Sequence, residues 1–157
     1  MSFEKLKIAT GFFDAFNSIG GGASCEVFSG RLFGMGVAVK RLKDGVKEWE
    51  KKQFAAEMAL LSRASHPNIC RLLAFSDDGP ERCLVLELCT GGSLYSRLAC
   101  RAATGEPAPA PLGWEQRVRL AVGIAQALAY LHQLKPQMIH RDLVIWMSRS
   151  GSDLRCI

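Results

Sequence analysis

A glycine-rich turn and a lysine fall at a spacing that could bind the phosphates of a nucleotide. The three glycines at 20–22 lack a Cβ, so the backbone can take positive φ and bring its N–H groups close to phosphate oxygens. Lys40 lies in the strand-like run 37–42, where period-two alternation places Ala38, Lys40 and Leu42 on one face. A lysine on an otherwise apolar face needs an anion beside it, which here could be phosphate.

The elements around the glycines distinguish two kinds of nucleotide site. In a dinucleotide-binding fold, such glycines follow a strand and open a helix. Here residues 26–29 are strand-like, and the turn at 34–36 leads into another strand at 37–42. Strand, glycine turn, strand, turn and strand form a meander, which argues against a nucleotide-binding oxidoreductase.

An amphipathic helix is predicted over 47–65, because helix formers are frequent there and Phe54, Met58 and Leu61 recur at i, i+4 and i+7. Glu57 lies at the edge of this apolar stripe, where an unpaired carboxylate would be costly. We expect Glu57 to pair with Lys40. The alternative is a glutamate on an exposed helix face.

These features resemble the start of a protein kinase catalytic domain. In that family the lysine grips the α- and β-phosphates of ATP, and the glutamate holds the lysine in place, so the resemblance implies these roles for Lys40 and Glu57. Cys25 stands where the family has its third glycine, and we expect it to narrow the approach of the backbone to phosphate. The positions matched to nucleotide binding are Ile19, Gly20, Gly22, Val27, Ala38, Lys40, Glu87 and Cys89.

Residues 2–13 are similar to the lead-in of plant receptor-like kinases and of the related interleukin-receptor-associated and Pelle kinases, with a short helix that Gly11 ends. This resemblance implies phosphorylation of protein serine or threonine, with tyrosine left open. Further along, strand patterns at 71–75 and 83–88 follow the turn at 66–69. The fold class is therefore predicted as α+β, with a complete small lobe of five antiparallel strands and one helix.

The family pattern continues into part of a large lobe. Leu86 takes the gatekeeper position, and the backbone of Glu87 and Cys89 is expected to face the adenine. The helix predicted at 114–132 is apolar nearly all round, so we expect it to be buried on every side. Asp142, in the His-Arg-Asp sequence at 140–142, resembles the catalytic aspartate that accepts the proton of the substrate hydroxyl.

The resemblance stops after residue 143. Val144 and Met147 stand where the family has a phosphate-facing lysine and a magnesium-binding asparagine, and the tail 144–157 shows neither strand alternation nor an Asp-Phe-Gly motif. ATP with magnesium is the family's cofactor, but the magnesium ligands are missing. We therefore expect a truncated chain of marginal stability that binds nucleotide weakly and has little or no activity. The alternative is a non-catalytic fragment that binds a partner kinase or a scaffold.

Composition limits the other classes of function. The predicted divisions are a lead-in at 1–13, a small lobe at 14–88, a hinge with a partial large lobe at 89–143 and a divergent tail at 144–157. The net charge of +5 comes from scattered lysines and arginines, which argues against nucleic-acid binding. Six cysteines without a C-x-x-C pair predict reduced thiols, no zinc site and a cytoplasmic location. No apolar run predicts a membrane segment.

Overall fold

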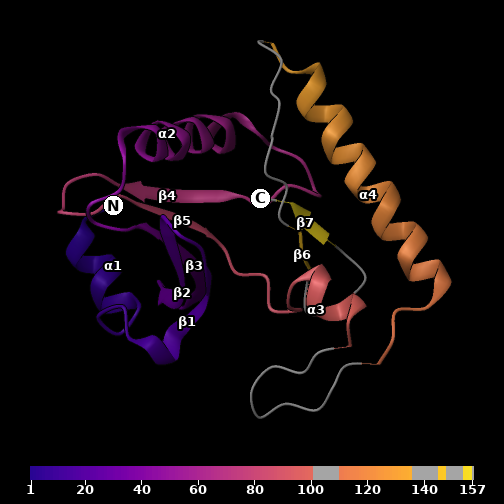
Figure 1. Ribbon diagram of the computed structural model, residues 1–157, viewed down its shortest axis with the longest axis horizontal. Helices are drawn as coiled ribbons and strands as arrows, with labels where there is room; N and C mark the ends of the chain where they lie inside the picture. The colour runs from indigo at the N-terminus through magenta and orange to yellow at the C-terminus, as the bar shows by residue number, and fades with distance from the viewer. Residues whose placement is uncertain (101–109, 136–144, 148–153, 157) are drawn as a thin grey trace. The chain divides into compact units, whose positions relative to one another are not determined.

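The computed structural model describes residues 1–100, 110–135, 145–147 and 154–156 (Figure 1). Within it the chain forms two compact units. The first contains Met1–Arg63 and Arg71–Leu88, and the second contains Ala64–Cys70 and Cys89–Ile157.

The first unit is built on a five-stranded antiparallel sheet (Figure 1). Its strands are β1 (Ser18–Gly21), β2 (Cys25–Leu32), β3 (Met35–Leu42), β4 (Leu72–Ser76) and β5 (Cys83–Glu87). They lie in the order β1-β2-β3-β5-β4, so β3 is central and bonded to both β2 and β5. This is the five-stranded small lobe that the sequence predicts, and the α+β fold class is confirmed.

A tight hairpin sets the register of β2 against β3. Leu32 pairs with Met35, which leaves only Phe33 and Gly34 in the turn. Both have positive φ, 50° and 80°, as the type I′ turn requires. Glycine tolerates this conformation, whereas a bulky aromatic residue is strained in it.

The N-terminal helix covers one face of the sheet. Helix α1 (Phe3–Ala9) contributes Phe3 and Leu6 to a core that also contains Val37, Val39, Cys83 and Val85 of the sheet. These strand residues alternate with Ala38, Lys40, Leu84 and Leu86, which lie on the opposite face. The short helix η1 (Ala15–Asn17) then leads into β1.

Helix α2 (Glu48–Arg63) presents the predicted apolar stripe. Phe54 and Leu61 are buried, as the periodicity indicates, and Leu60 is buried beside them. Met58 is only half-buried. The helix is two residues shorter at its end than the predicted 47–65, because the backbone leaves the helix before Pro67.

The second unit contains α3 (Leu94–Leu98) and α4 (Trp114–Gln133). Ser93 caps α3 by accepting a hydrogen bond from the Ser96 N–H at 3.1 Å, so residues 90–94 lead into a helix as predicted. In the segment Ala64–Cys70 of the same unit, the Ser65 N–H donates a hydrogen bond to the Tyr130 hydroxyl, and the Tyr130 ring packs against His66.

The prediction that the long helix is buried on every side is wrong. Only one stripe of α4 is buried, formed by Leu120, Gly123, Ala127 and Leu131. Val118 and Val122 are 42% and 50% exposed. A continuous apolar pattern predicts which surface prefers burial, but it does not supply the elements that would cover it.

The tail contains two short strands, although its sequence shows no strand alternation. Strands β6 (Ile145–Met147) and β7 (Leu154–Cys156) pair antiparallel, with Trp146 opposite Arg155. Each strand has only three residues, which is too short for period-two alternation to be recognised in the sequence.

Candidate functional site

The centre of the candidate site is an ion pair between β3 and α2. Lys40 Nζ lies 2.8 Å and 2.6 Å from the two carboxylate oxygens of Glu57. The side chains are 23% and 20% exposed, so solvent screens the attraction only in part. The pairing expected from the sequence is therefore present, and it fixes the ammonium group above the sheet.

The surface around Lys40 is apolar. The strand register places Val27 beside Lys40 on β2, Leu84 beside it on β5, and Leu86 beside Ala38. Ala38, Leu84 and Leu86 are buried, whereas Val27 is half-buried. A lysine beside apolar side chains suits a ligand with an aromatic ring and an anionic end.

The glycine turn is held by its own backbone and by a lysine. The Gly22 N–H donates to the Cys25 carbonyl at 2.8 Å, and Lys43 Nζ donates to the Gly22 carbonyl at 3.0 Å. A Cβ at Gly21 would lie 2.9 Å from the Cys25 carbonyl oxygen, so only glycine fits there without a shift. Lys43 was not predicted as a site residue, although its place just after β3 could have indicated this contact with the glycine turn.

Cys25 lies on the same face as Lys40, because it pairs with Leu42 in the register of β2 and β3. Burial raises the pKa of its thiol, and the nearby positive charge of Lys40 offsets this only in part. The thiol therefore stays neutral at physiological pH and does not neutralise Lys40. An approaching phosphate would meet an uncharged side chain at this position.

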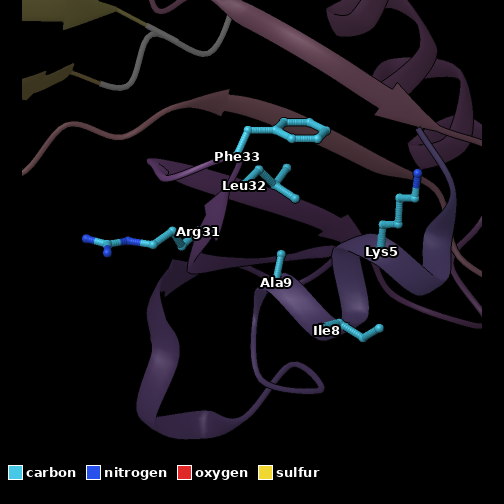
Figure 2. Close-up of a pocket in the computed structure, with 6 residues that line it drawn as sticks. All are labelled: Lys5, Ile8, Ala9, Arg31, Leu32 and Phe33. Atoms are coloured by element: carbon cyan, nitrogen blue, oxygen red, sulfur yellow. The ribbon is translucent and has the colours of Figure 1, made fainter.

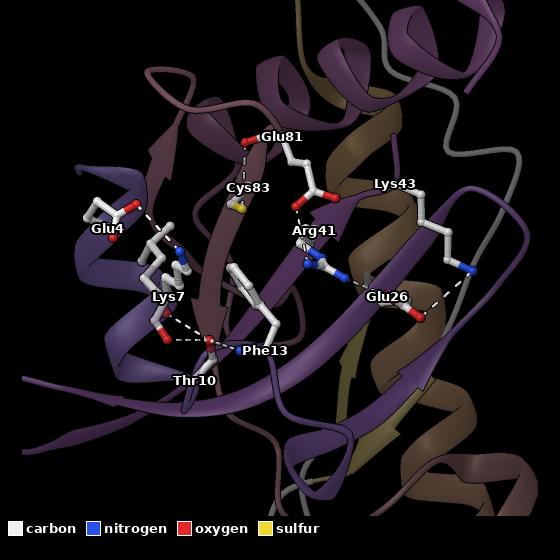
Figure 3. Close-up of polar contacts among 10 residues, drawn as sticks. Glu4, Lys7, Thr10, Phe13, Glu26, Arg41, Lys43, Glu81 and Cys83 are labelled. Carbon is white, nitrogen blue, oxygen red and sulfur yellow. Dashed lines mark hydrogen bonds and ion pairs between the residues drawn. The ribbon is translucent and has the colours of Figure 1, made fainter. Parts of the chain in front are cut away.

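Arg41 anchors β3 from the opposite face of the sheet (Figure 3). Its guanidinium group bonds Glu26 of β2 at 2.8 Å and Glu81 at 3.2 Å. The same group lies 4.5 Å from the ring centre of Phe13 and 5.2 Å from that of Phe28. Because Arg41 follows Lys40 directly, these contacts restrain the strand segment that carries the lysine.

The turn after α1 directs Phe13 towards Arg41 (Figure 3). The Thr10 hydroxyl donates to the Leu6 carbonyl at 2.8 Å and accepts a hydrogen bond from the Phe13 N–H at 3.3 Å. Gly11, Phe12 and Phe13 all have positive φ in this turn. The lead-in segment is thus packed on the sheet, behind the strand that positions Lys40.

Comparison with known proteins agrees with this geometry. The family described as "Protein tyrosine and serine/threonine kinase" matches residues 13–145. This chain belongs to the protein kinase family. The match begins at Phe13 and includes β1 to β5, both helices that follow the sheet, and the His-Arg-Asp sequence.

Two curated relatives of this kinase-family chain come from Arabidopsis thaliana. One is named a "probable leucine-rich repeat receptor-like protein kinase" and is 37% identical over 144 residues, which cover 90% of this chain and 14% of the relative. The other is named a receptor-like cytosolic serine/threonine-protein kinase and is 38% identical over 146 residues, covering 90% of this chain and 30% of the relative. The chain therefore spans less than a third of either relative.

Most residues matched to nucleotide binding lie in the first unit of this kinase chain. Ile19 and Gly20 belong to β1, and Glu87 ends β5, where its N–H donates to the Arg71 carbonyl at 3.0 Å. Cys89 belongs to the second unit and is half-buried. Asp142 lies outside the described residues, so its role as the catalytic base stays a prediction.

The donor set does not fit the magnesium ion that the kinase family implies. Met147, at the position of the family's asparagine, offers a soft thioether sulfur where magnesium requires hard oxygen ligands. In the described part of the chain, no three His, Cys, Asp or Glu side chains group together as a metal site. Over the same residues, no helix is long and apolar enough to cross a membrane.

Proposed function

We propose that the first unit of this chain binds ATP through the face of the sheet that carries Lys40. The observation that supports this is the Lys40–Glu57 ion pair beside a glycine turn and an apolar surface. Lys40 would contact the α- and β-phosphates, and Glu57 would hold its ammonium group there. The glycine turn would direct backbone N–H groups at the phosphates, while Val27, Ala38 and Leu86 would contact the adenine.

The reaction that we propose, from the chemistry of the family, is phosphoryl transfer to a protein serine or threonine, with tyrosine left open as an acceptor. Asp142 would accept the proton of the attacking hydroxyl group. Val144 and Met147 replace the lysine and asparagine that would handle phosphate charge and metal, so we propose that this chain transfers phosphate weakly or not at all. That the acceptor is a protein is inferred from the family alone, because no contact in this chain indicates it.

A phosphate-transfer assay, together with a measurement of ATP binding by the same proteins, tests this proposal. The full chain is incubated with labelled ATP and a generic basic protein, beside Asp142→Asn and Lys40→Met variants. We expect ATP binding that Lys40→Met removes, together with little or no transfer above the Asp142→Asn background. Efficient transfer that depends on Asp142 would contradict the proposed inactivity, and binding that survives Lys40→Met would contradict the proposed nucleotide site.

The second candidate function is a non-catalytic role in which the chain binds a partner kinase or a scaffold. The observation that favours it is the exposed apolar face of α4, which includes Val118 and Val122. Substitution of both residues by glutamine would abolish such binding without affecting ATP binding. An unchanged interaction with a candidate full-length kinase would argue against this role.

We also propose a cytosolic location. It rests on the likeness to the relative named as cytosolic. Fluorescence imaging of the tagged chain tests it, and a signal concentrated at membranes would contradict it.

A further inference from the structure

A shallow pocket of about 190 Å³, largely open to solvent, lies between α1 and the hairpin that joins β2 to β3 (Figure 2). Helix α1 contributes Lys5, Ile8 and Ala9, and the hairpin contributes Arg31, Leu32 and Phe33. Figure 2 shows Ala9 directed towards Leu32 and Phe33, with Lys5 and Arg31 on opposite sides. The lining is thus apolar in the middle and positively charged at both ends.

Phe33 lines this pocket in a strained backbone conformation. It is 82% exposed and has a φ of 50°, a conformation in which asparagine or glycine would be less strained. Ile8, on the other wall, is 67% exposed. An aromatic ring held in solvent by a strained turn contributes little to folding, which favours a role in contact with another molecule.

The charges around the pocket define the chemistry of that molecule. In the part of the chain that the structure describes, neither Lys5 nor Arg31 has an acidic partner. The nearest acidic side chain along α1, Glu4, instead pairs with Lys7 at 3.8 Å. Two unneutralised cations on either side of an apolar hollow are complementary to an apolar group flanked by carboxylates.

We propose that this pocket docks an acidic segment of a partner protein. One aromatic or aliphatic side chain of that segment fills the hollow against Phe33 and Leu32, and carboxylates on either side pair with Lys5 and Arg31. The volume suits a single side chain, and anchoring by one buried apolar residue between charged contacts is a common mode of peptide recognition. The proposal does not depend on nucleotide binding.

Two other occupants agree less well with the surface. A second copy of this chain in a two-fold interface would bring the same basic pocket towards itself, and like charges would repel. Anionic membranes attract clusters of four or more basic residues, whereas the lining of this pocket contains two, Lys5 and Arg31. Helix α1 packs on the side of the sheet opposite Lys40, so the part of the pocket that α1 contributes lies away from the nucleotide face.

Fluorescence anisotropy with short synthetic peptides tests the proposal on the full chain. In the probe peptides, one Phe, Leu or Trp stands between pairs of glutamates. Control peptides replace the apolar residue by serine or the glutamates by lysines. The test variants are Phe33→Asn and the double variant Lys5→Glu with Arg31→Glu. Matched controls are Phe16→Ala, which changes an aromatic residue that is 99% exposed outside the pocket, and Lys52→Glu on α2.

We expect the acidic apolar peptides to bind, and Phe33→Asn to weaken binding on the order of tenfold or more, as the loss of an anchoring residue does. The double charge reversal should abolish this binding and create binding of the lysine-flanked peptides, which a folding defect cannot imitate. Phe16→Ala and Lys52→Glu should bind as the parent chain does. A melting temperature of Phe33→Asn no lower than that of the parent confirms that it is folded.

Three results would overturn the proposal. The first is the absence of binding to any acidic apolar peptide, and the second is binding that Phe33→Asn and the charge reversal leave unchanged. The third is binding to vesicles rich in phosphatidylserine, or a Phe33-dependent dimer on gel filtration, in place of peptide binding. Either form of the third result would assign the surface to a different occupant.

Discussion

Removing one partner of the Lys40–Glu57 pair should destabilise the first unit more than removing both. About four-fifths of each side chain is buried, so the pair lies between an exposed ion pair, worth about 0–1 kcal/mol, and a fully buried one, whose disruption costs about 3–5 kcal/mol. We expect Lys40→Met or Glu57→Leu alone to cost about 2 kcal/mol, which lowers the melting temperature by about 4–8 °C in a chain of this size. The double variant should recover part of this loss, with a coupling of about 1–2 kcal/mol.

Urea unfolding followed by tryptophan fluorescence measures all four proteins of this cycle. The matched control is the same cycle on Lys51 and Glu48, which also pair at 2.7 Å but are exposed at 44% and 79% of their side-chain surface. Its coupling should be much smaller, because water screens the charges. If the Lys40–Glu57 coupling does not exceed that of the control pair, the ion pair does not position Lys40 as we argue.

Three further predictions concern the fold around the site. Phe33→Asn should raise the melting temperature by about 2–4 °C, because it relieves about 1 kcal/mol of strain at a positive φ, and scanning calorimetry measures this. Gly79→Ala should destabilise the unit by about 1–3 kcal/mol in urea unfolding, because a Cβ there would overlap the buried Phe3 ring; a neutral effect would show that α1 is not packed on the sheet. Burial raises the pKa of Cys83 to about 12 from its ordinary 9.0. The unfolded chain therefore releases this proton first, so stability should fall between these pH values, and Cys83→Ala should flatten that decline in urea titrations.

The sequence predicts the structure correctly where a local pattern and a fixed family spacing agree. Alternation along 37–42 predicts the central strand, and Phe54 with Leu61 predicts the inward face of α2. The Lys40–Glu57 contact crosses 17 positions of the chain, and the family resemblance predicts it because the helix and strand recur at that spacing.

The features that sequence reasoning missed depend on contacts between distant segments. Arg41 is held by Phe13, Glu26, Phe28 and Glu81, which come from separate parts of the chain, and no local period brings them together. The burial of α4 was predicted wrongly because composition indicates a preference for burial and not the presence of a covering element. The pairing of β6 with β7 was missed because three residues carry too little pattern.

Mapping ATP onto the chain by NMR chemical shifts tests the central claim most directly. Because the donor set does not fit magnesium, the titration is made in the presence of a chelator as well as with the metal. We predict that ATP shifts the backbone amides of Gly20, Gly22, Val27, Ala38 and Lys40 in both conditions, and that Lys40→Met removes these shifts while Phe16→Ala retains them. No shift in these amides, or shifts confined to the opposite face of the sheet, would contradict a nucleotide site at Lys40.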